Sequence, residues 1–331
     1  MTGKRIGIGV IGAGAMGTYH VAALAGSVPG AEVVAVHDAD PERAGHAAAL
    51  CGATMKESVE ALLGERRVEA VLVASPDPTH AELVLACLAA EKSVLCEKPL
   101  ATDPDDARRV IDAEIAGGRK RVQVGFMRRY DPGFTELKAT LDSEAIGAPR
   151  VVHCVHRNPA PYPGITASGI VRNTMIHELD VLRWLLGAEI TSICVQTCSS
   201  ADPLAPQLAL IRVGEVMASV EVSVNARYGY DVRCEVVGES GTATLIAPSA
   251  VRTQIAGVEA VPIFPGFVAR FGAAYLAQLR DWVEGVRTET VLGPTAWDGF
   301  MAEVVAGSAV DALVTGLLQQ VWSPERPTLY A

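Results

Sequence analysis

The sequence predicts an α/β protein of two domains, a doubly wound parallel sheet followed by an α+β domain with a large, mostly antiparallel open sheet. Its 331 residues are long for a single domain. In residues 1–127, short apolar strands alternate with helix-length segments, which is typical of parallel strands joined by helices. In residues 128–331, strand-like runs follow one another with turn signals between them, and hairpins are therefore expected.

The first expected strand, residues 6–11, runs into a turn at residues 12–17 with the spacing G-x-G-x-x-G, and a helix follows. Gly12 permits a tight turn, Gly14 lets a pyrophosphate approach the backbone, and Gly17 lets helix and strand pack closely. The helix start offers free N–H groups and the positive end of its dipole to phosphates. Alone this motif is a weak signal, because glycines also mark ordinary turns.

A second expected strand, residues 32–37, ends at Asp38, about 20 residues beyond the turn. A carboxylate in that place accepts hydrogen bonds from the ribose hydroxyls of adenosine and repels a 2′-phosphate, which predicts NAD rather than NADP. Arg43 could serve a phosphate, but its place inside the next helix favours a solvent-facing side chain. Together, the strand, glycines, helix and acid predict a Rossmann-type dinucleotide site. Its predicted contact residues are Gly12, Ala13, Gly14, Ala15, Met16, Gly17 and Asp38.

Lys98 follows another expected strand, residues 93–96, in the sequence Glu97-Lys98-Pro99. Proline pushes the preceding residue out of the α region, so Lys98 is held extended. Ligands of an open parallel sheet bind beyond the carboxyl ends of its strands, and Lys98 is therefore expected where cofactor meets substrate. The alternative is a solvated lysine in a turn. Further predicted cofactor contacts are Ser75, His80, Glu97 and Lys98, with a solvated position in the first helical turn as the alternative for His80.

The second domain is expected to begin with a strand at residues 150–157, from which a Pro/Gly-rich loop leads to a helix at residues 174–186 that Gly187 ends. Two helices close the chain, each with an apolar row at i+4 spacing that is expected to face the core or another subunit. The first row is Phe271, Tyr275, Leu279 and Val283, and the second is Met301, Val305, Ala309, Leu313 and Leu317. The other expected strands are residues 193–197, 208–213, 216–224, 234–237 and 242–246.

Composition excludes some classes of function. The net charge of −10 argues against a nucleic-acid surface. The seven cysteines are scattered without metal-ligand spacing, which predicts buried free thiols in a reducing compartment and chemistry without a metal. The sequence shows neither a signal-peptide layout nor an apolar stretch of spanning length, so a cytoplasmic protein without a membrane partner is expected.

With these motifs in this order, the chain resembles the glucose–fructose oxidoreductase, inositol dehydrogenase and rhizopine-catabolism family. In the first half the resemblance rests on the glycine-rich turn, Asp38, Ser75-Pro76, Glu97-Lys98-Pro99 and residues 126–131. Residues 156–159, 173–180 and 228–231 narrow it to inositol 2-dehydrogenases, and it spans nearly the whole chain. It implies an oxidoreductase that transfers a hydride between a secondary alcohol of a cyclic polyol, such as myo-inositol, and NAD, giving the ketone.

The resemblance also implies that Lys98, His177 and Asn173 are the catalytic residues. His177 would accept the hydroxyl proton, a task that suits histidine because its pKa lies near neutrality, and Lys98 would polarise the same oxygen. The family pattern has aspartate at the position of Asn173. Since asparagine carries no charge, it should lower the pKa of His177 and weaken it as a base. Asn173 could also simply be the helix N-cap.

A small polyol or sugar is the expected substrate. His156 and Asn158 are two positions apart at a strand end, so their side chains could point the same way. They are expected either to contact the substrate or to anchor the loop, and Tyr230 is expected either to bind substrate or to pack on the sheet. The predicted substrate-binding residues are Lys98, His156, Asn158, Asn173, His177 and Tyr230. The alternatives are an NAD(P)-dependent sugar dehydrogenase or reductase and a non-catalytic NAD-binding protein. A homo-oligomer, dimer or tetramer, built on the apolar sheet is expected by analogy of fold.

Overall fold

A computed structural model describes residues 5–246 and 251–331, and the chain divides into two compact units. The first crossing from one unit to the other follows Phe126, one residue from the boundary that the sequence predicts after residue 127. None of the helices within the described ranges is long and apolar enough to cross a membrane. Unit 1 contains the chain up to Phe126 together with Tyr275–Glu303 and Glu325–Ala331, and unit 2 contains Met127–Ala274 and Val304–Pro324.

The two long C-terminal helices are divided between the units, which differs from the continuous second domain of the sequence analysis. Helix α9 (Phe267–Thr288) begins in unit 2 and ends in unit 1, and α10 (Ala296–Thr315) does the reverse. Leu279, Trp282 and Val283 of α9 are buried in the same hydrophobic core as β1 and β2. An apolar row along a helix does not indicate which of two hydrophobic cores it packs into. The division of α9 and α10 between the units could therefore not be predicted from their sequences. The tasks assigned to the two domains stay predictions.

Unit 1 contains a six-stranded parallel sheet with the strand order β3-β2-β1-β4-β5-β6, which confirms the doubly wound fold. Every residue of β1 is buried, as expected for a central strand covered on both faces. The strand order reverses between β1 and β4, and this switch point is where such sheets bind ligands. The strands are β1 (Ile6–Ile11), β2 (Ala31–His37), β3 (Thr54–Met55), β4 (Ala70–Val73), β5 (Ser93–Cys96) and β6 (Val122–Val124).

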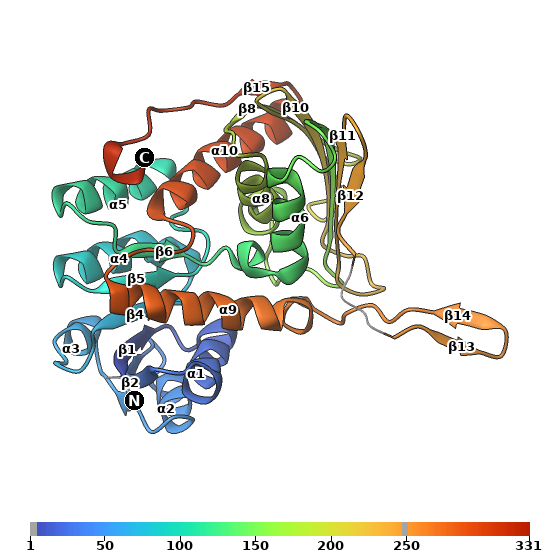
Figure 1. The fold of residues 1–331 in the computed structure, drawn as a ribbon. Helices are drawn as coiled ribbons and strands as arrows, with labels where there is room; N and C mark the ends of the chain where they lie inside the picture. Colours follow the sequence, from blue (N-terminus) through green and yellow to red (C-terminus); the bar gives the residue numbers. More distant parts are fainter. Residues whose placement is uncertain (1–4, 247–250) are drawn as a thin grey trace. The chain divides into compact units, whose positions relative to one another are not determined.

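The helices of unit 1 connect these strands, and α4 and α5 lie side by side (Figure 1). Three of them begin at an acidic or hydroxyl N-cap whose side chain accepts from a backbone N–H of the first turn, namely Asp40, Ser58 and Asp103. The helical segments are α1 (Ala15–Ser27), α2 (Pro41–Ala49), α3 (Val59–Leu63), η1 (Asp77–Thr79), α4 (His80–Ala89), α5 (Pro104–Ala116) and η4 (Thr328–Tyr330).

Unit 2 contains a seven-stranded sheet in the order β12-β11-β7-β10-β9-β8-β15. Its neighbouring strands are antiparallel except for β7 and β10, so the prediction of a mostly antiparallel sheet is confirmed. Helices α6 and α8 cover one face of this sheet, and a two-stranded ribbon extends away from it (Figure 1). The strands are β7 (Pro149–Arg157), β8 (Ile190–Thr197), β9 (Gln207–Val213), β10 (Val216–Ser223), β11 (Asp231–Gly238), β12 (Thr242–Thr244), β13 (Thr253–Ile255), β14 (Val258–Ala260) and β15 (Gln319–Gln320). Its short helices are η2 (Met127–Tyr130) and α6 (Pro132–Asp142).

The helix that carries Asn173 and His177 starts earlier than its sequence indicates. It comprises α7 (Ala167–Ile170), the π-helical segment η3 (Val171–Met175) and α8 (Ile176–Leu186). The predicted end is confirmed, since Gly187 closes α8 in the left-handed conformation with φ 61°. Asn173 lies inside the π-helical segment, and Thr166 is the N-cap that accepts from the N–H of Gly169. The N-cap interpretation of Asn173 is therefore wrong.

One of the two predicted apolar rows is fully buried, and the other only in part. In α9, the row that starts at Phe271 is in the core throughout. In α10, Met301, Val305 and Ala309 are buried, whereas Leu317 lies beyond the end of the helix and is 66% exposed. The glycine at position 316, with φ 69°, follows the helix and ends the row.

Candidate active site

The glycine-rich turn between β1 and α1 has the geometry that its spacing predicts. Gly12 has a φ of 94°, and a Cβ on it would lie 2.5 Å from the backbone of Ala74. A Cβ on Gly17 would lie 1.9 Å from the carbonyl oxygen of Gly12, so close packing of helix and strand demands glycine there. A Cβ on Gly14 would meet no described atom within 4 Å. Packing therefore does not require Gly14, in agreement with its predicted task of admitting a pyrophosphate.

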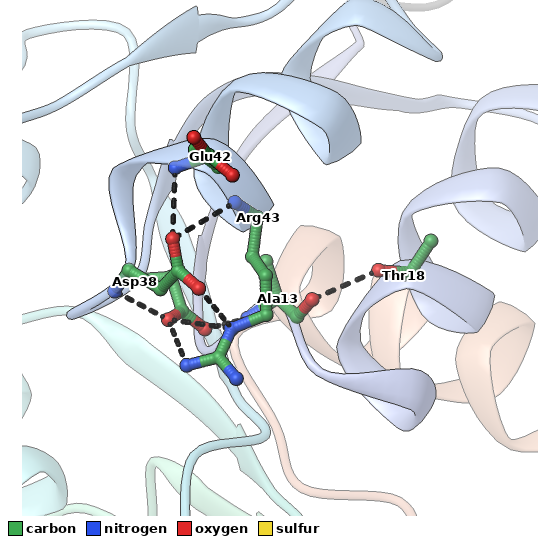
Figure 2. A network of polar contacts seen from close by, with 6 residues as sticks. Ala13, Thr18, Asp38, Glu42 and Arg43 are labelled. Atoms are coloured by element: carbon green, nitrogen blue, oxygen red, sulfur yellow. Dashed lines mark hydrogen bonds and ion pairs between the residues drawn. The ribbon is translucent and has the colours of Figure 1, made fainter.

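Asp38, at the end of β2, is tied to this turn (Figure 2). Its Oδ2 accepts a hydrogen bond from the N–H of Ala13 at 2.6 Å, and its Oδ1 accepts from the N–H of Asp40 at 2.8 Å. Arg43 donates to the same Oδ1 from Nη2 at 3.0 Å and from Nε at 3.2 Å. Partial burial opposes ionisation of Asp38, but these hydrogen bonds and the charge of Arg43 outweigh it and lower the pKa of the carboxyl group.

Arg43 faces solvent, as its place in a helix predicts, and it also pairs with Asp38. Its side chain is 55% exposed, as expected for a residue of α2, but the guanidinium turns toward the carboxylate. It also borders an open hollow of about 630 Å³ beside the glycine-rich turn. The α1 N-terminus, which no described side chain caps, opens on the same turn through Ala15 and Met16. The hollow is lined by Ala13, Gly14, Ala15, Thr18, Asp40, Glu42, Arg43 and His46.

Ser75 and His80 meet at the carboxyl end of β4. The Nε2 of His80 lies 2.9 Å from the carbonyl oxygen of Ser75, and its Nδ1 lies 2.6 Å from that of Pro99. The hydroxyl of Ser75 lies 2.6 Å from that of Thr79. His80 is buried, so the interpretation of this residue as a solvated first-turn side chain is wrong. A direct contact of Ser75 or His80 with the cofactor stays a prediction.

Glu97 and Lys98 follow β5 at the same edge of the sheet. Glu97 is buried, and its Oε1 lies 2.7 Å from Nε2 of His20 on α1. Burial opposes the ionisation of Glu97, but the hydrogen bond with His20 and the charges of His20, Lys98 and His80 outweigh it and lower its pKa. Lys98 is half-buried, and its bond to Pro99 is cis. Glu97 thus connects α1 to the turn that carries Lys98, and a direct contact of Glu97 or Lys98 with the cofactor stays a prediction.

A buried polar cluster of Arg128, His156, Glu178 and Tyr230 lies in unit 2. Arg128 donates from Nη1 to Oε1 of Glu178 and from Nη2 to Nδ1 of His156, the latter at 3.0 Å. Burial would lower the pKa of Arg128, but the carboxylate of Glu178 outweighs this and raises it. Burial likewise opposes ionisation of Glu178, and the charge of Arg128 keeps its pKa below the ordinary value. The cluster therefore contains a fixed ion pair away from water.

The two ring nitrogens of His156 have different neighbours. Its Nδ1 lies 3.0 Å from Nη2 of Arg128, which donates, and 3.2 Å from Oε2 of Glu178, which accepts. Its Nε2 lies 3.2 Å from the hydroxyl oxygen of Tyr230. Burial raises the pKa of Tyr230 to about 12. The ring of His156 also lies 6.0 Å from that of His177.

The other predicted residues of unit 2 have mixed surroundings. The backbone of Asn158 accepts from the N–H of Ala226 at 2.9 Å and donates to Ser223 at 2.8 Å, so it anchors its loop. The ring of Tyr230 packs edge-on against Phe267 and Phe271 while its hydroxyl reaches His156. The ring of Tyr230 can therefore pack in the core while its hydroxyl group stays available for substrate binding. Substrate contact by His156, Asn158 and Tyr230 stays a prediction.

Asn173 is half-buried and His177 is buried, four positions apart and both in unit 2. The π-helical segment that contains Asn173 widens the helix by a residue directly before α8, which carries His177. Such segments occur often at functional sites. The predicted pairing of His177 with Lys98 joins residues of different units and stays a prediction.

The sequence-based predictions do not include four charged residues that pair in unit 2, namely Arg128, Arg129, Glu178 and Asp180. Besides Arg128 and Glu178, Arg129 donates from Nε to Oδ2 of Asp180 at 3.0 Å. All four lie in segments that carry the family resemblance, residues 126–131 and 173–180. A sequence signal was present, because two adjacent arginines after a strand and two acids inside an apolar helix need partners when buried.

The switch-point turn, the acid at the end of β2 and the hollow beside them define a dinucleotide-binding α/β unit, which a second, α+β unit accompanies in the same chain. The sequence profile described as "Oxidoreductase family, NAD-binding Rossmann fold" matches residues 6–126, and the one described as "GFO/IDH/MocA C-terminal domain" matches residues 134–244. The chain therefore belongs to the glucose–fructose oxidoreductase, inositol dehydrogenase and rhizopine-catabolism family, and its cofactor is NAD.

Named relatives are similar over almost the full length. Inositol 2-dehydrogenase 1 of Saccharopolyspora erythraea is 43% identical, with 98% of both chains covered. The crystal structure of myo-inositol dehydrogenase from Lactobacillus casei in complex with NAD(H) and myo-inositol superposes with a TM-score of 0.95 at 35% identity, covering 99% of this chain and 100% of that one. Apo scyllo-inositol dehydrogenase from the same organism gives 0.91 at 26% identity, covering 97% and 99%.

Proposed function

We propose that the chain is an NAD-dependent inositol 2-dehydrogenase that oxidises a secondary alcohol of myo-inositol or a related cyclitol to the ketone. The observation that carries the proposal is the 43% identity to an inositol 2-dehydrogenase over 98% of both chains, with Lys98 and His177 present in their motifs. The Lactobacillus casei structure, whose name specifies NAD(H) and myo-inositol, supports the same substrate class.

In this proposal, the residues of the chain handle the proton and position the alcohol. Bound NAD would supply the hydride acceptor. His177 accepts the hydroxyl proton, and Lys98 donates a hydrogen bond that stabilises the alkoxide as it develops. Asn173 hydrogen-bonds a substrate hydroxyl through its amide. His156 and Tyr230, which the hydrogen bonds of the buried polar cluster hold in place, orient the ring hydroxyls.

Asp38, the turn and the hollow would hold the adenosine half of NAD. Asp38 is ionised and lies against the N–H of Ala13, so its oxygens are placed to accept from ribose hydroxyls. Gly14 leaves open space for the pyrophosphate, and the uncapped start of α1 provides backbone donors.

A second candidate is a dehydrogenase for another stereoisomer or a sugar derivative. Asn173 favours it, because the family pattern of inositol dehydrogenases has aspartate there, and the fold is shared with a scyllo-inositol dehydrogenase. Two further parts of the proposal are a homo-oligomer and a cytoplasmic location. The first rests on exposed leucines of β9, and the second on seven cysteines that are all free thiols, as suits a reducing compartment.

The test is a screen of myo-inositol, scyllo-inositol, other cyclitols and hexoses, each with NAD and with NADP, followed by nicotinamide absorbance. We expect the highest kcat/KM with a cyclitol and NAD, and a Lys98→Ala variant that loses at least a hundredfold in kcat. Lys92, half-buried on the loop before β5 where it donates to the carbonyl oxygen of Val68, provides the control variant Lys92→Ala. Tight NAD binding without turnover of any polyol would contradict the proposal, as would full activity of Lys98→Ala.

A further inference from the structure

His80 touches two backbone carbonyl oxygens, and this double contact limits its protonation state. Its Nδ1 lies 2.6 Å from the oxygen of Pro99 and its Nε2 lies 2.9 Å from the oxygen of Ser75. Carbonyl oxygens only accept hydrogen bonds, so each contact requires a proton on the nitrogen. The neutral ring has one N–H, and its other nitrogen would direct a lone pair at a carbonyl oxygen.

Neither a change of tautomer nor a flip of the ring removes this conflict. Exchanging the tautomer only moves the repulsion from one carbonyl to the other. Flipping the ring would place carbon atoms at 2.6 and 2.9 Å from oxygen, well inside the roughly 3.3–3.6 Å of C–H···O contacts. Only the imidazolium, which donates at both nitrogens, satisfies both contacts.

The surroundings provide the negative charge that a buried cation requires. Glu97, buried at the end of β5, is a carboxylate, because its hydrogen bond with His20 lowers its pKa against the effect of burial. Asp77 lies in η1 directly before His80. Glu82, in the first turn of α4, is exposed and paired with Arg109 of α5, so that pair adds little net charge. The cations are Lys98, which follows Glu97, and His20 whenever it is protonated. Glu97 and Asp77 are therefore the acids that offset the cost of burying the charge of His80.

The two carbonyl groups belong to different strand ends. Ser75 follows β4, and Pro99 belongs to the turn after β5 that carries Lys98. We propose that His80 is an imidazolium that clamps the end of β4 to the Lys98–Pro99 turn and so acts as a positioning residue for Lys98. The inference deepens the proposed function and rests on it in one respect, the role of Lys98 at the substrate oxygen.

The first test is the protonation state of the ring in the protein without substrate or cofactor. Long-range nitrogen–proton correlation spectra of histidine-labelled protein near neutral pH would show His80, assigned by its loss in His80→Gln. We expect both ring nitrogens at the positions of protonated nitrogen. A ring with one protonated and one unprotonated nitrogen would overturn the proposal. This result is independent of which polyol the enzyme accepts, so it separates failure of this inference from failure of the proposed function.

The second test is kinetic. In His80→Gln, the amide group can donate to one of the two carbonyl oxygens but cannot reach both as the charged ring does. The turn that carries Lys98 is then no longer held to the end of β4, and Lys98 should lose its fixed position. We expect kcat to fall at least tenfold and by a larger factor than the Kd of NADH, measured by its fluorescence, rises, because the Asp38 half of the site is untouched. The control is His153→Gln, an exposed histidine of β7 that contacts Ser219. Unchanged kcat in His80→Gln, or an equal loss in His153→Gln, would overturn the positioning role.

Discussion

The carboxylate of Asp38 is held from several sides by this chain itself. The N–H groups of Ala13 and Asp40 and the guanidinium of Arg43 all donate to it. The same guanidinium that neutralises Asp38 borders the hollow beside the glycine-rich turn. We therefore expect selectivity for NAD to depend on a balance between two side chains, because Asp38 would repel a 2′-phosphate and Arg43 would attract one.

We expect Asp38→Ser to raise kcat/KM with NADP at least tenfold and to lower it with NAD. The carboxylate that repels the 2′-phosphate is removed, and Arg43 is released toward it. The measurement is the ratio of kcat/KM for the two cofactors with one polyol. In the double variant Asp38→Ser/Arg43→Ala, the gain with NADP should disappear. A gain that persists without Arg43 would contradict its assignment as the phosphate partner.

Asn173 carries a second prediction at this scale. In Asn173→Asp, a carboxylate should favour the charged form of His177 and raise its pKa, which makes His177 a stronger base. The neutral form must accept the proton, so the acid limb of kcat/KM against pH should move to higher pH while the plateau with myo-inositol rises about tenfold. The pH profile with myo-inositol measures both effects.

The control for Asn173→Asp is Asn225→Asp, which adds the same charge to an exposed position of unit 2. It should leave the profile unchanged, because exposed charges are screened by solvent. If Asn173→Asp lowers activity with myo-inositol and with other cyclitols alike, the amide is needed as it stands and the dyad interpretation is wrong.

At the scale of elements, the sequence predicts strand ends better than buried charge pairs. Glycine spacing, Asp38 and the Glu97-Lys98-Pro99 turn depend on local backbone geometry, which neighbouring residues determine. The π-helical segment directly precedes α8, which is buried on nearly all sides, and no local pattern in its sequence indicates it. Arg128 and Glu178 lie 50 positions apart, and no local pattern indicates that they meet. Pairing over such distances is decided by the tertiary fold alone.

We expect Glu178→Gln to lower the free energy of unfolding of the protein by about 3–5 kcal/mol, because it leaves Arg128 buried without its counter-charge. The measurement is chemical denaturation followed by far-ultraviolet circular dichroism. Glu239→Gln, which breaks the exposed pair with Arg150 in the same unit, should cost about 1 kcal/mol or less. An equal loss in free energy of unfolding in the two variants would contradict the expectation that the buried ion pair stabilises the fold more than the exposed one.

The same pair predicts how stability depends on pH. The pKa of folded Glu178 lies below its ordinary value of 4.5, so the carboxylate stabilises the fold above that pH. This stability is lost as the pH falls through the lower, folded pKa. Glu178→Gln should therefore show a smaller loss of stability between neutral and acidic pH than the unchanged protein. A pH dependence identical in both would mean that other carboxyl groups account for it.

At the scale of the whole molecule, exposed apolar side chains gather on one face of the unit 2 sheet. Leu208 and Leu210 of β9 are 54% and 52% exposed, while Ala209 between them is buried. Met217 of β10, 40% exposed, lies on the neighbouring strand. Apolar side chains gathered on a solvent-facing sheet mark interaction sites more often than single exposed residues do.

We expect the protein to be a dimer or tetramer in solution and Leu208→Asp/Leu210→Asp to shift it toward the monomer of 34.7 kDa. Two carboxylates on this face would have to be desolvated in an interface, which costs more than the lost apolar contact alone. Light scattering coupled to size-exclusion chromatography measures the mass. Ile115→Asp, at an exposed apolar residue of α5 in unit 1, is the matched control and should leave the mass unchanged. A protein that is monomeric before any substitution, or an oligomer that tolerates both aspartates, would show that this face is not the interface.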